Sequence, residues 1–219
     1  MTYLVDHVKE FAGLLPRNSI LLDIGCGNKP YFRLFENCIN YMGVDAFISG
    51  RTFQNKKPDL FFNGKHLPLN NNSVDAILCT QVLEHASDLY DLMQEIYRVM
   101  KPGAIGLITV PFMWGEHETP YDFRRFTSFG IKKFITDNGF CVIDQNKCCL
   151  GVKAIQTIIF SEFDNYKDNI RLTKTKWDKI KFQIIDKISH KFILLLMKLL
   201  NKFYVFERIY IDNAIIFKK

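Results

Sequence analysis

The sequence predicts an α/β fold built on an open, doubly wound sheet of mostly parallel strands. Apolar runs of strand length alternate with helix-like segments from residue 19 onward, which is the pattern of a sheet covered by helices. The runs do not alternate strictly with polar residues, as expected for parallel strands buried on both faces. The chain has 219 residues, of which 48% are hydrophobic and 24% charged. This size and composition suit a single domain spanning residues 1–219.

The predicted strands are separated by intervals that leave room for helices. Each is rich in apolar and β-branched side chains, and they cover residues 19–25, 40–47, 59–63, 74–82 and 103–111. A further short apolar run, 214–217, is typical of a returning edge strand. Ligands of such a sheet bind at the carboxyl ends of its strands, so the loops that follow the strands are where a site is expected.

Two helices are predicted from apolar stripes between start and stop signals. Residues 88–103 carry apolar side chains at helical spacing, with a candidate cap at Asp88 and a stop at Pro102. Residues 127–140 show a similar pattern that begins at Thr127, a good N-cap residue. Polar caps followed by an apolar stripe indicate helices that pack on the sheet.

Residues 151–210 differ in composition from the rest, being rich in lysine and isoleucine. Residues 1–149 hold 15 Lys/Arg and 16 Asp/Glu, a net charge of −1, whereas residues 150–210 hold 12 and 6, a net charge of +6. The positive charge is therefore a local patch, which argues against a general nucleic-acid-binding surface. We interpret 151–210 as a basic amphipathic helical insertion before the last strand, and predict no nucleic-acid partner.

Within the insertion, residues 176–206 place apolar side chains at helical spacing between lysines. Such a stripe packs on the sheet or on a second copy of the chain, as in a homodimer, or it lies in a membrane interface. Both alternatives stay open. The apolar run 192–200 is too short to span a bilayer, which takes about 20 residues. The N-terminus lacks the basic-then-apolar layout of a secretory signal, so we expect a cytoplasmic protein, with peripheral membrane contact as the second alternative.

The six cysteines show no Cys-x-x-Cys pair and no regular framework spacing. This distribution predicts neither a zinc site nor a disulfide scaffold. Buried, reduced thiols fit it better, and no metal site is predicted.

The stretch LLDIGCGNKPYF, residues 21–32, places two glycines directly after the first predicted strand. A dinucleotide-binding turn needs a third glycine or alanine three residues after Gly27, where this chain has Pro30. The alternative is a ligand without phosphates, whose amino-acid part needs a bare backbone and an acid such as Asp23. Asp45, at the tip of the second strand, can accept hydrogen bonds from ribose hydroxyls. Nicotinamide and adenosyl ligands share that feature, so Asp45 does not distinguish them.

Four stretches in order resemble the successive motifs of class I S-adenosylmethionine-dependent methyltransferases. They are LLDIGCGNKPYF, YMGVDA, FFNGKHLPLNNNSVDAILCTQVLEH and LYDLMQEIYRVMKPGAIGLITVP. The resemblance covers residues 19 to about 150 and lies nearest the branch with small-molecule and quinone C-methyltransferases. It implies a Rossmann-like, seven-stranded sheet with helices on both faces, and S-adenosyl-L-methionine as cofactor.

The same resemblance implies roles for individual residues. The methionine part of the cofactor would lie against Asp23, Gly25, Cys26 and Gly27. The ribose would be held by Asp45, with Ala46 beside it. The adenine would meet Asn63 and Gly64, where the family has an aspartate, and Gln81 would lie beneath the methyl-donor centre. His85 matches a family position that usually caps a turn.

The loop after the fifth strand, residues 111–130, is the densest cluster of polar and aromatic groups in the chain. Its string H-x-x-P-x-D-x-x-R-x-T resembles one found in bacterial relatives that modify sugars or cell-surface glycans. Histidine side chains can exchange a proton near neutral pH, and His117 is our candidate base for an acceptor hydroxyl. The candidate acceptor-binding residues are Trp114, Tyr121, Arg124 and Arg125. In a plainer alternative, Asp122 and Arg125 pair to stiffen the loop, and His117 only packs against it.

These features predict a methyltransferase that acts on a small-molecule, sugar or lipid-linked acceptor. A second interpretation is a cofactor-binding interaction subunit of the same fold without catalysis, suggested by Asn63 and by the missing third glycine. The acceptor atom cannot be identified from the sequence.

Overall fold

The computed structural model describes residues 2–36, 40–46, 58–173, 187, 189, 191–200, 202 and 207–219. The chain forms two compact units. The first comprises Met1–Phe112, Glu116–Cys148 and Asp212–Lys219, and the second comprises Met113–Gly115 and Cys149–Ile211. The second unit includes residues 151–210; that this segment is an insertion into a single domain stays a prediction.

Seven strands form one sheet in the order β3-β2-β1-β4-β5-β7-β6. The strands are β1 Ile20–Ile24, β2 Asn40–Ala46, β3 Leu60–Phe62, β4 Val74–Thr80, β5 Met100–Pro111, β6 Cys141–Leu150 and β7 Tyr210–Lys218. From β3 to β5 neighbouring strands are parallel, and β7 runs antiparallel to β5. The predicted α/β fold with a mostly parallel, seven-stranded sheet is confirmed.

Two predicted details are wrong. The run 214–217 belongs to β7, which lies between β5 and β6 and is not an edge strand. The first eight residues of β7 are all buried, as a strand with neighbours on both sides requires. The helix predicted at 88–103 ends at Val99, and β5 begins at once with Met100, so Pro102 lies inside a strand.

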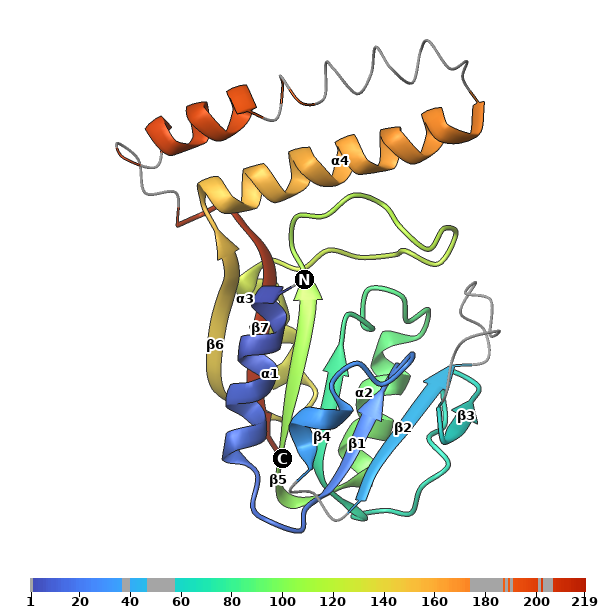
Figure 1. Ribbon diagram of the computed structural model, residues 1–219. Coiled ribbons are helices and arrows are strands. Elements are labelled where there is room, and N and C mark those ends of the chain that lie inside the picture. Colours follow the sequence, from blue (N-terminus) through green and yellow to red (C-terminus); the bar gives the residue numbers. More distant parts are fainter. Residues whose placement is uncertain are drawn as a thin grey trace. The chain divides into compact units, whose positions relative to one another are not determined.

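Helices cover both faces of the sheet, as Figure 1 shows for α1, Thr2–Leu14, and α2, Leu89–Val99. Apolar residues of α2 and of α3, Ser128–Asp137, share a core with Leu22, Ile77 and other strand residues. Their strand neighbours Leu21 and Leu78 point into a second core, which α1 fills from the opposite face. Successive strand residues thus serve opposite faces, which explains the continuous apolar runs in the sequence.

The second unit contains α4, Val152–Thr173, and a helical stretch at 191–200. Most of the predicted amphipathic helix 176–206 falls outside the described residues. Among the helices that are described, none combines the length and the apolarity that crossing a membrane would take.

Candidate active site

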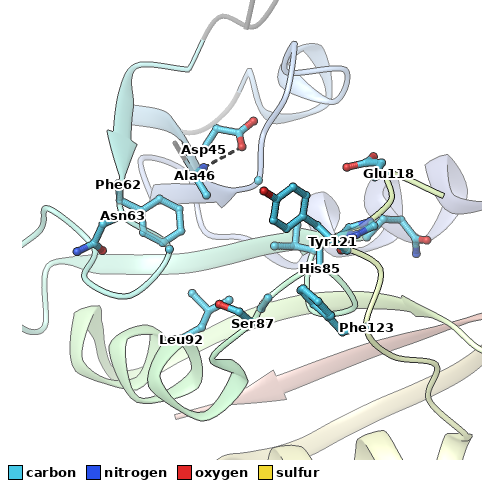
Figure 2. Close-up of a pocket in the computed structure, with 15 residues that line it drawn as sticks. Asp45, Ala46, Phe62, Asn63, His85, Ser87, Leu92, Glu118, Tyr121 and Phe123 are labelled. Atoms are coloured by element: carbon cyan, nitrogen blue, oxygen red, sulfur yellow. Dashed lines mark hydrogen bonds between the residues drawn. The ribbon is translucent and has the colours of Figure 1, made fainter. Parts of the chain in front are cut away.

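A pocket lies at the carboxyl ends of the parallel strands, within the first unit. Five segments line it: the turn after β1, the end of β2, the end of β3 with its following turn, the loop after β4 with the start of α2, and the loop after β5. Figure 2 shows Phe62 and Asn63 on one side of the pocket and Glu118 and Tyr121 on the other. This is the edge of the sheet at which the sequence analysis places the site.

The turn after β1 depends on glycine. Gly25 has φ +67°, and a Cβ atom there would lie 2.3 Å from Cγ2 of Val82. Its N–H donates to the Val44 carbonyl at 2.8 Å, which holds the turn against β2. Gly25 lines the pocket, whereas the buried Cys26 side chain packs against Gly43. A bare backbone therefore faces the ligand space, in agreement with the role expected for this turn.

Asp45 brings a carboxylate to the pocket from the tip of β2. It is 5% exposed, and its two oxygens accept from the N–H groups of Gly27 at 3.2 Å and of Ala46 at 2.8 Å. Figure 2 shows the bond to Ala46 as a dashed line. Both Asp45 and Ala46 line the pocket. These two bonds fix the orientation of the carboxylate at the edge of the pocket.

Asp23 is held at the end of β1 with 2% of its surface exposed. Burial raises the pKa of its carboxyl to about 7, while the hydrogen bond from the Tyr41 hydroxyl and the charge of Lys29 act in the opposite direction. Asp23 is not among the residues that line the pocket. Its predicted contact with the methionine part of a cofactor stays a prediction.

Asn63 and Gly64 line the pocket next to Phe62. The Asn63 side-chain oxygen accepts from the N–H groups of Lys65 at 2.9 Å and of His66 at 2.8 Å. That oxygen therefore stabilises the turn after β3. An adenine amine would compete with these two bonds, so the expected Asn63–adenine contact stays a prediction.

Gln81 follows β4 and lines the pocket with a left-handed backbone, φ 55°. Its N–H donates to the Thr109 carbonyl at 2.9 Å, and its side-chain amide donates to the Thr109 hydroxyl at 3.2 Å. Glu118, also at the pocket, has φ 53°. Non-glycine residues in this conformation cost about 1–3 kcal/mol each and concentrate at functional sites.

The loop after β5 holds His117 in a network of charges. His117 Nδ1 lies 3.2 Å from Oδ2 of Asp122, whose side chain is 2% exposed. Arg125 donates to both carboxylate oxygens of Asp122, at 2.5 and 2.7 Å, and this pairing lowers the pKa of Asp122 to about 2. The Asp122–Arg125 pair of the plainer alternative is therefore present. It also orients the His117 ring.

The candidate acceptor-binding residues separate in the structure. Tyr121 lines the pocket. Arg124 donates to the carbonyls of Ala86 and Ser87, and Arg125 is engaged by Asp122. Trp114 belongs to the second unit. Of these four residues, Tyr121 is the one that lines the pocket.

Sequence reasoning gave no role to Glu84 and treated His85 as a turn residue. Glu84 is 0% exposed, and burial raises the pKa of its carboxyl to about 8. His85 lines the pocket, its Nδ1 lies 2.7 Å from the Tyr121 carbonyl oxygen, and its ring meets the His117 ring edge to face at 4.8 Å. In the sequence, Glu84 and His85 follow shortly after the apolar strand β4. This acid–histidine pair at a strand end is the signal that could have identified both as site residues.

Three buried acids lie at or next to this edge of the sheet. Burial raises the pKa of Asp23, of Glu84 and of Asp212, the last to about 6. In each case the cause is the cost of an ionised carboxylate in a medium of low dielectric constant.

Comparisons with known proteins agree with this geometry. The archaeal structure described as a SAM dependent methyltransferase from Archaeoglobus fulgidus superposes with a TM-score of 0.58, covering 99% of this chain and 93% of that chain at 17% identity. It shows the same fold. Residues 22–108, from β1 into β5, match the family model described as a methyltransferase domain.

Two relatives are similar to this chain in sequence. The tRNA (carboxymethyluridine(34)-5-O)-methyltransferase of Schizosaccharomyces pombe is 30% identical over 108 residues, which are 49% of this chain and 47% of the relative. An uncharacterised protein of Methanocaldococcus jannaschii is 28% identical over 182 residues, 79% of this chain and 80% of the relative. The match thus spans about half the length of the yeast enzyme. Residues 22–108 are thus similar to a methyltransferase domain, and the chain has the fold of the Archaeoglobus structure.

Proposed function

We propose that the protein transfers a methyl group from S-adenosylmethionine to a hydroxyl of a small-molecule, sugar or lipid-linked acceptor. The observation that carries the proposal is the pocket that joins Gly25, Asp45 and Asn63 at the carboxyl ends of β1, β2 and β3. The bare backbone at Gly25 suits the amino-acid part of the cofactor. The Asp45 carboxylate suits the ribose, and the polar turn at Asn63 suits the adenine. The buried acids nearby suit its sulfonium and ammonium charges.

The chemistry needs little from the protein beyond alignment. The sulfonium is a strong electrophile, so holding the acceptor in line and excluding water supply most of the rate. A hydroxyl acceptor also loses a proton as the carbon–oxygen bond forms and the carbon–sulfur bond breaks. His117 is suited to take it, because its Nδ1 faces Asp122 and a neutral ring with Nδ1 protonated carries its lone pair on Nε2.

The acceptor class rests on weaker support than the cofactor. The loop string shared with sugar-modifying relatives favours a glycan or lipid-linked acceptor, and membrane contact through 176–206 would suit a lipid-linked one. The similarity to a tRNA methyltransferase favours a second candidate, methyl transfer to tRNA. Residues 1–149 carry a net charge of −1, which speaks against a large phosphate-binding surface on that part of the chain.

Two measurements on the full chain test the proposal. Calorimetric titration with S-adenosylmethionine and S-adenosylhomocysteine should show one site, and the proposal fails if neither ligand binds. Transfer of a radiolabelled methyl group should then be measured with sugar, lipid-linked and tRNA acceptors side by side. Labelling of tRNA alone would replace the glycan candidate with the tRNA candidate.

His117→Ala is the test of the proposed base. Turnover should fall by about 10²–10⁴, the usual loss of a general base, while the affinity for S-adenosylhomocysteine stays within about threefold. The matched control is His7→Ala, on α1 and paired with Glu10, which should change neither quantity. Unchanged turnover in His117→Ala would remove His117 from the mechanism.

The alternative of a non-catalytic cofactor-binding subunit has one observation in its favour. The Asn63 oxygen is already bonded to two backbone N–H groups, so a standard adenine contact is not ready-made there. This alternative predicts cofactor binding without transfer to any acceptor in the panel.

A further inference from the structure

Glu84 poses an energetic problem that the methyl-transfer proposal does not solve. The residue is 0% exposed, and neither carboxylate oxygen has a hydrogen-bond partner on another of the described residues. The nearby Arg125 guanidinium is bonded to Asp122. A buried acid without such partners is costly. A buried Glu84 therefore points to a bound ligand that interacts with its carboxylate and is not part of the protein chain.

Two histidines converge on this carboxylate. One ligand-type atom from each of Glu84, His85 and His117 lies within 4.8 Å of the other two, and His85 Nε2 is 3.8 Å from Glu84 Oε1. Two ligands bound to one metal ion at about 2.0–2.2 Å each stand roughly 3–3.5 Å apart. Side-chain shifts of about an ångström would therefore bring all three atoms onto one ion.

Hydrogen bonds on the far side of each ring prepare both histidines as ligands. His85 Nδ1 lies 2.7 Å from the Tyr121 carbonyl oxygen, which can only accept, so Nδ1 carries the proton. His117 Nδ1 faces Asp122 at 3.2 Å. In both rings the lone pair is thus on Nε2. A carbonyl or carboxylate behind the ring is the usual arrangement around metal-binding histidines.

We propose that Glu84, His85 and His117 bind a divalent first-row transition-metal ion, such as Zn²⁺, Mn²⁺, Fe²⁺ or Co²⁺. Two imidazoles and one carboxylate suit such ions, whereas Mg²⁺ and Ca²⁺ prefer oxygen ligands alone. Three protein ligands leave coordination positions open, as in catalytic sites. All three residues lie in the first unit, and His85 also lines the pocket.

The role of the ion rests on the proposed function, although its binding does not. An acceptor hydroxyl bound at an open position would have a lowered pKa and would need no separate base. With the ion present, His117 acts as a ligand, and the ion takes over the activation assigned above to the imidazole. Loss of turnover in His117→Ala fits both roles, so metal binding itself must be measured.

The test is titration of chelator-treated, full-length protein with Co²⁺, followed by visible absorption, and with Zn²⁺ by calorimetry. We expect one ion per chain and at least about 100-fold weaker binding in Glu84→Gln and His117→Ala. Glu84→Gln keeps the side-chain volume and removes the charge, so it should fold. His7→Ala is again the control and should bind as the parent does. Equal binding by parent and Glu84→Gln, or a thiolate-to-cobalt charge-transfer band, would overturn the proposal.

Binding of S-adenosylhomocysteine is measured on the same samples to separate the two proposals. The metal-site proposal expects it to survive chelation, while methyl transfer falls and is restored by added ion. If the cofactor binds but Co²⁺ and Zn²⁺ do not, the metal site is refuted and the proposed function stands. If both ions bind but the cofactor does not, the proposed function fails alone.

Discussion

Removal of the Asp45 carboxylate is the sharpest test of how the cofactor is held. If Asp45 binds the ribose as proposed, Asp45→Ala removes two charge-assisted hydrogen bonds at a position that is 5% exposed. Bonds to charged groups contribute about 1.5–3 kcal/mol each and rarely add fully. We therefore expect a loss of roughly 2–4 kcal/mol, or about 30- to 1000-fold weaker binding of S-adenosylhomocysteine in calorimetry.

A matched control separates this loss from damage to the fold. Asp45 also accepts from two backbone N–H groups, so Asp45→Ala should lower stability slightly. Asp75 accepts from the Ile20 N–H at 2.9 Å and from Lys101 at 2.7 Å, near the opposite end of β4. Asp75→Ala should destabilise the fold comparably and keep cofactor affinity within about twofold. If Asp45→Ala binds the cofactor as tightly as the parent, the ribose assignment is wrong and the motif interpretation weakens with it.

The remaining predictions concern the turn after β1 and the acid that precedes it. Gly25→Ala should weaken cofactor binding at least about tenfold and lower the melting temperature. Its Cβ would meet Val82 at 2.3 Å, and a left-handed backbone costs a non-glycine residue about 1–2 kcal/mol; a variant with parental affinity would contradict this. Asp23 has a pKa of about 7 against an ordinary 3.8, so between these values the folded state holds a proton that the unfolded chain has lost. Its contribution to stability should therefore fall as pH rises through this window, by up to about 1.4 kcal/mol per unit. Denaturant unfolding at pH 5, 6 and 7 should show this slope as a difference between the parent and Asp23→Asn, and parallel curves would refute the shift.

Local patterns predicted the strands well but not their order. Predicted 19–25 and 74–82 correspond to β1, Ile20–Ile24, and β4, Val74–Thr80, because continuous apolar runs mark strands buried on both faces. Nothing in the short run 214–217 reveals that β7 enters between β5 and β6, since strand order depends on tertiary pairing. Pro102 was taken as a stop signal, yet it lies near the start of a strand, where proline is tolerated.

For the candidate site too, the sequence predicts local features but not contacts between distant segments. Gly25, Asp45, Asn63, Gly64 and Gln81 were predicted as site residues and all line the pocket. Each stands at or just after a strand end, a position that a local pattern can mark. The burial of a side chain and its contacts across the fold are not local properties.

Glu84 and His117 illustrate that limit. Both are polar residues in loops; the sequence analysis assigns no role to Glu84, and it interprets His117 either as a base or as a ring that packs against the loop. The fold buries Glu84 completely and places His117, from the loop after β5, within 4.8 Å of it. The absence of cysteine pairs predicted no metal site, because that reasoning considers ligand spacing along the chain rather than ligands joined across two loops.

The cost of burying ionised carboxylates connects the stability of this sheet edge with the binding of ligands to it. The carboxyls of Asp23, Glu84 and Asp212 lie at or next to one end of the sheet, and burial raises the pKa of all three. Each therefore weakens the ligand-free fold when it ionises, and each ionises more readily beside a positive charge. A sulfonium cofactor and the proposed divalent cation would both supply such charge. Binding of either cation would therefore offset part of the free energy that burying these acids costs the ligand-free fold.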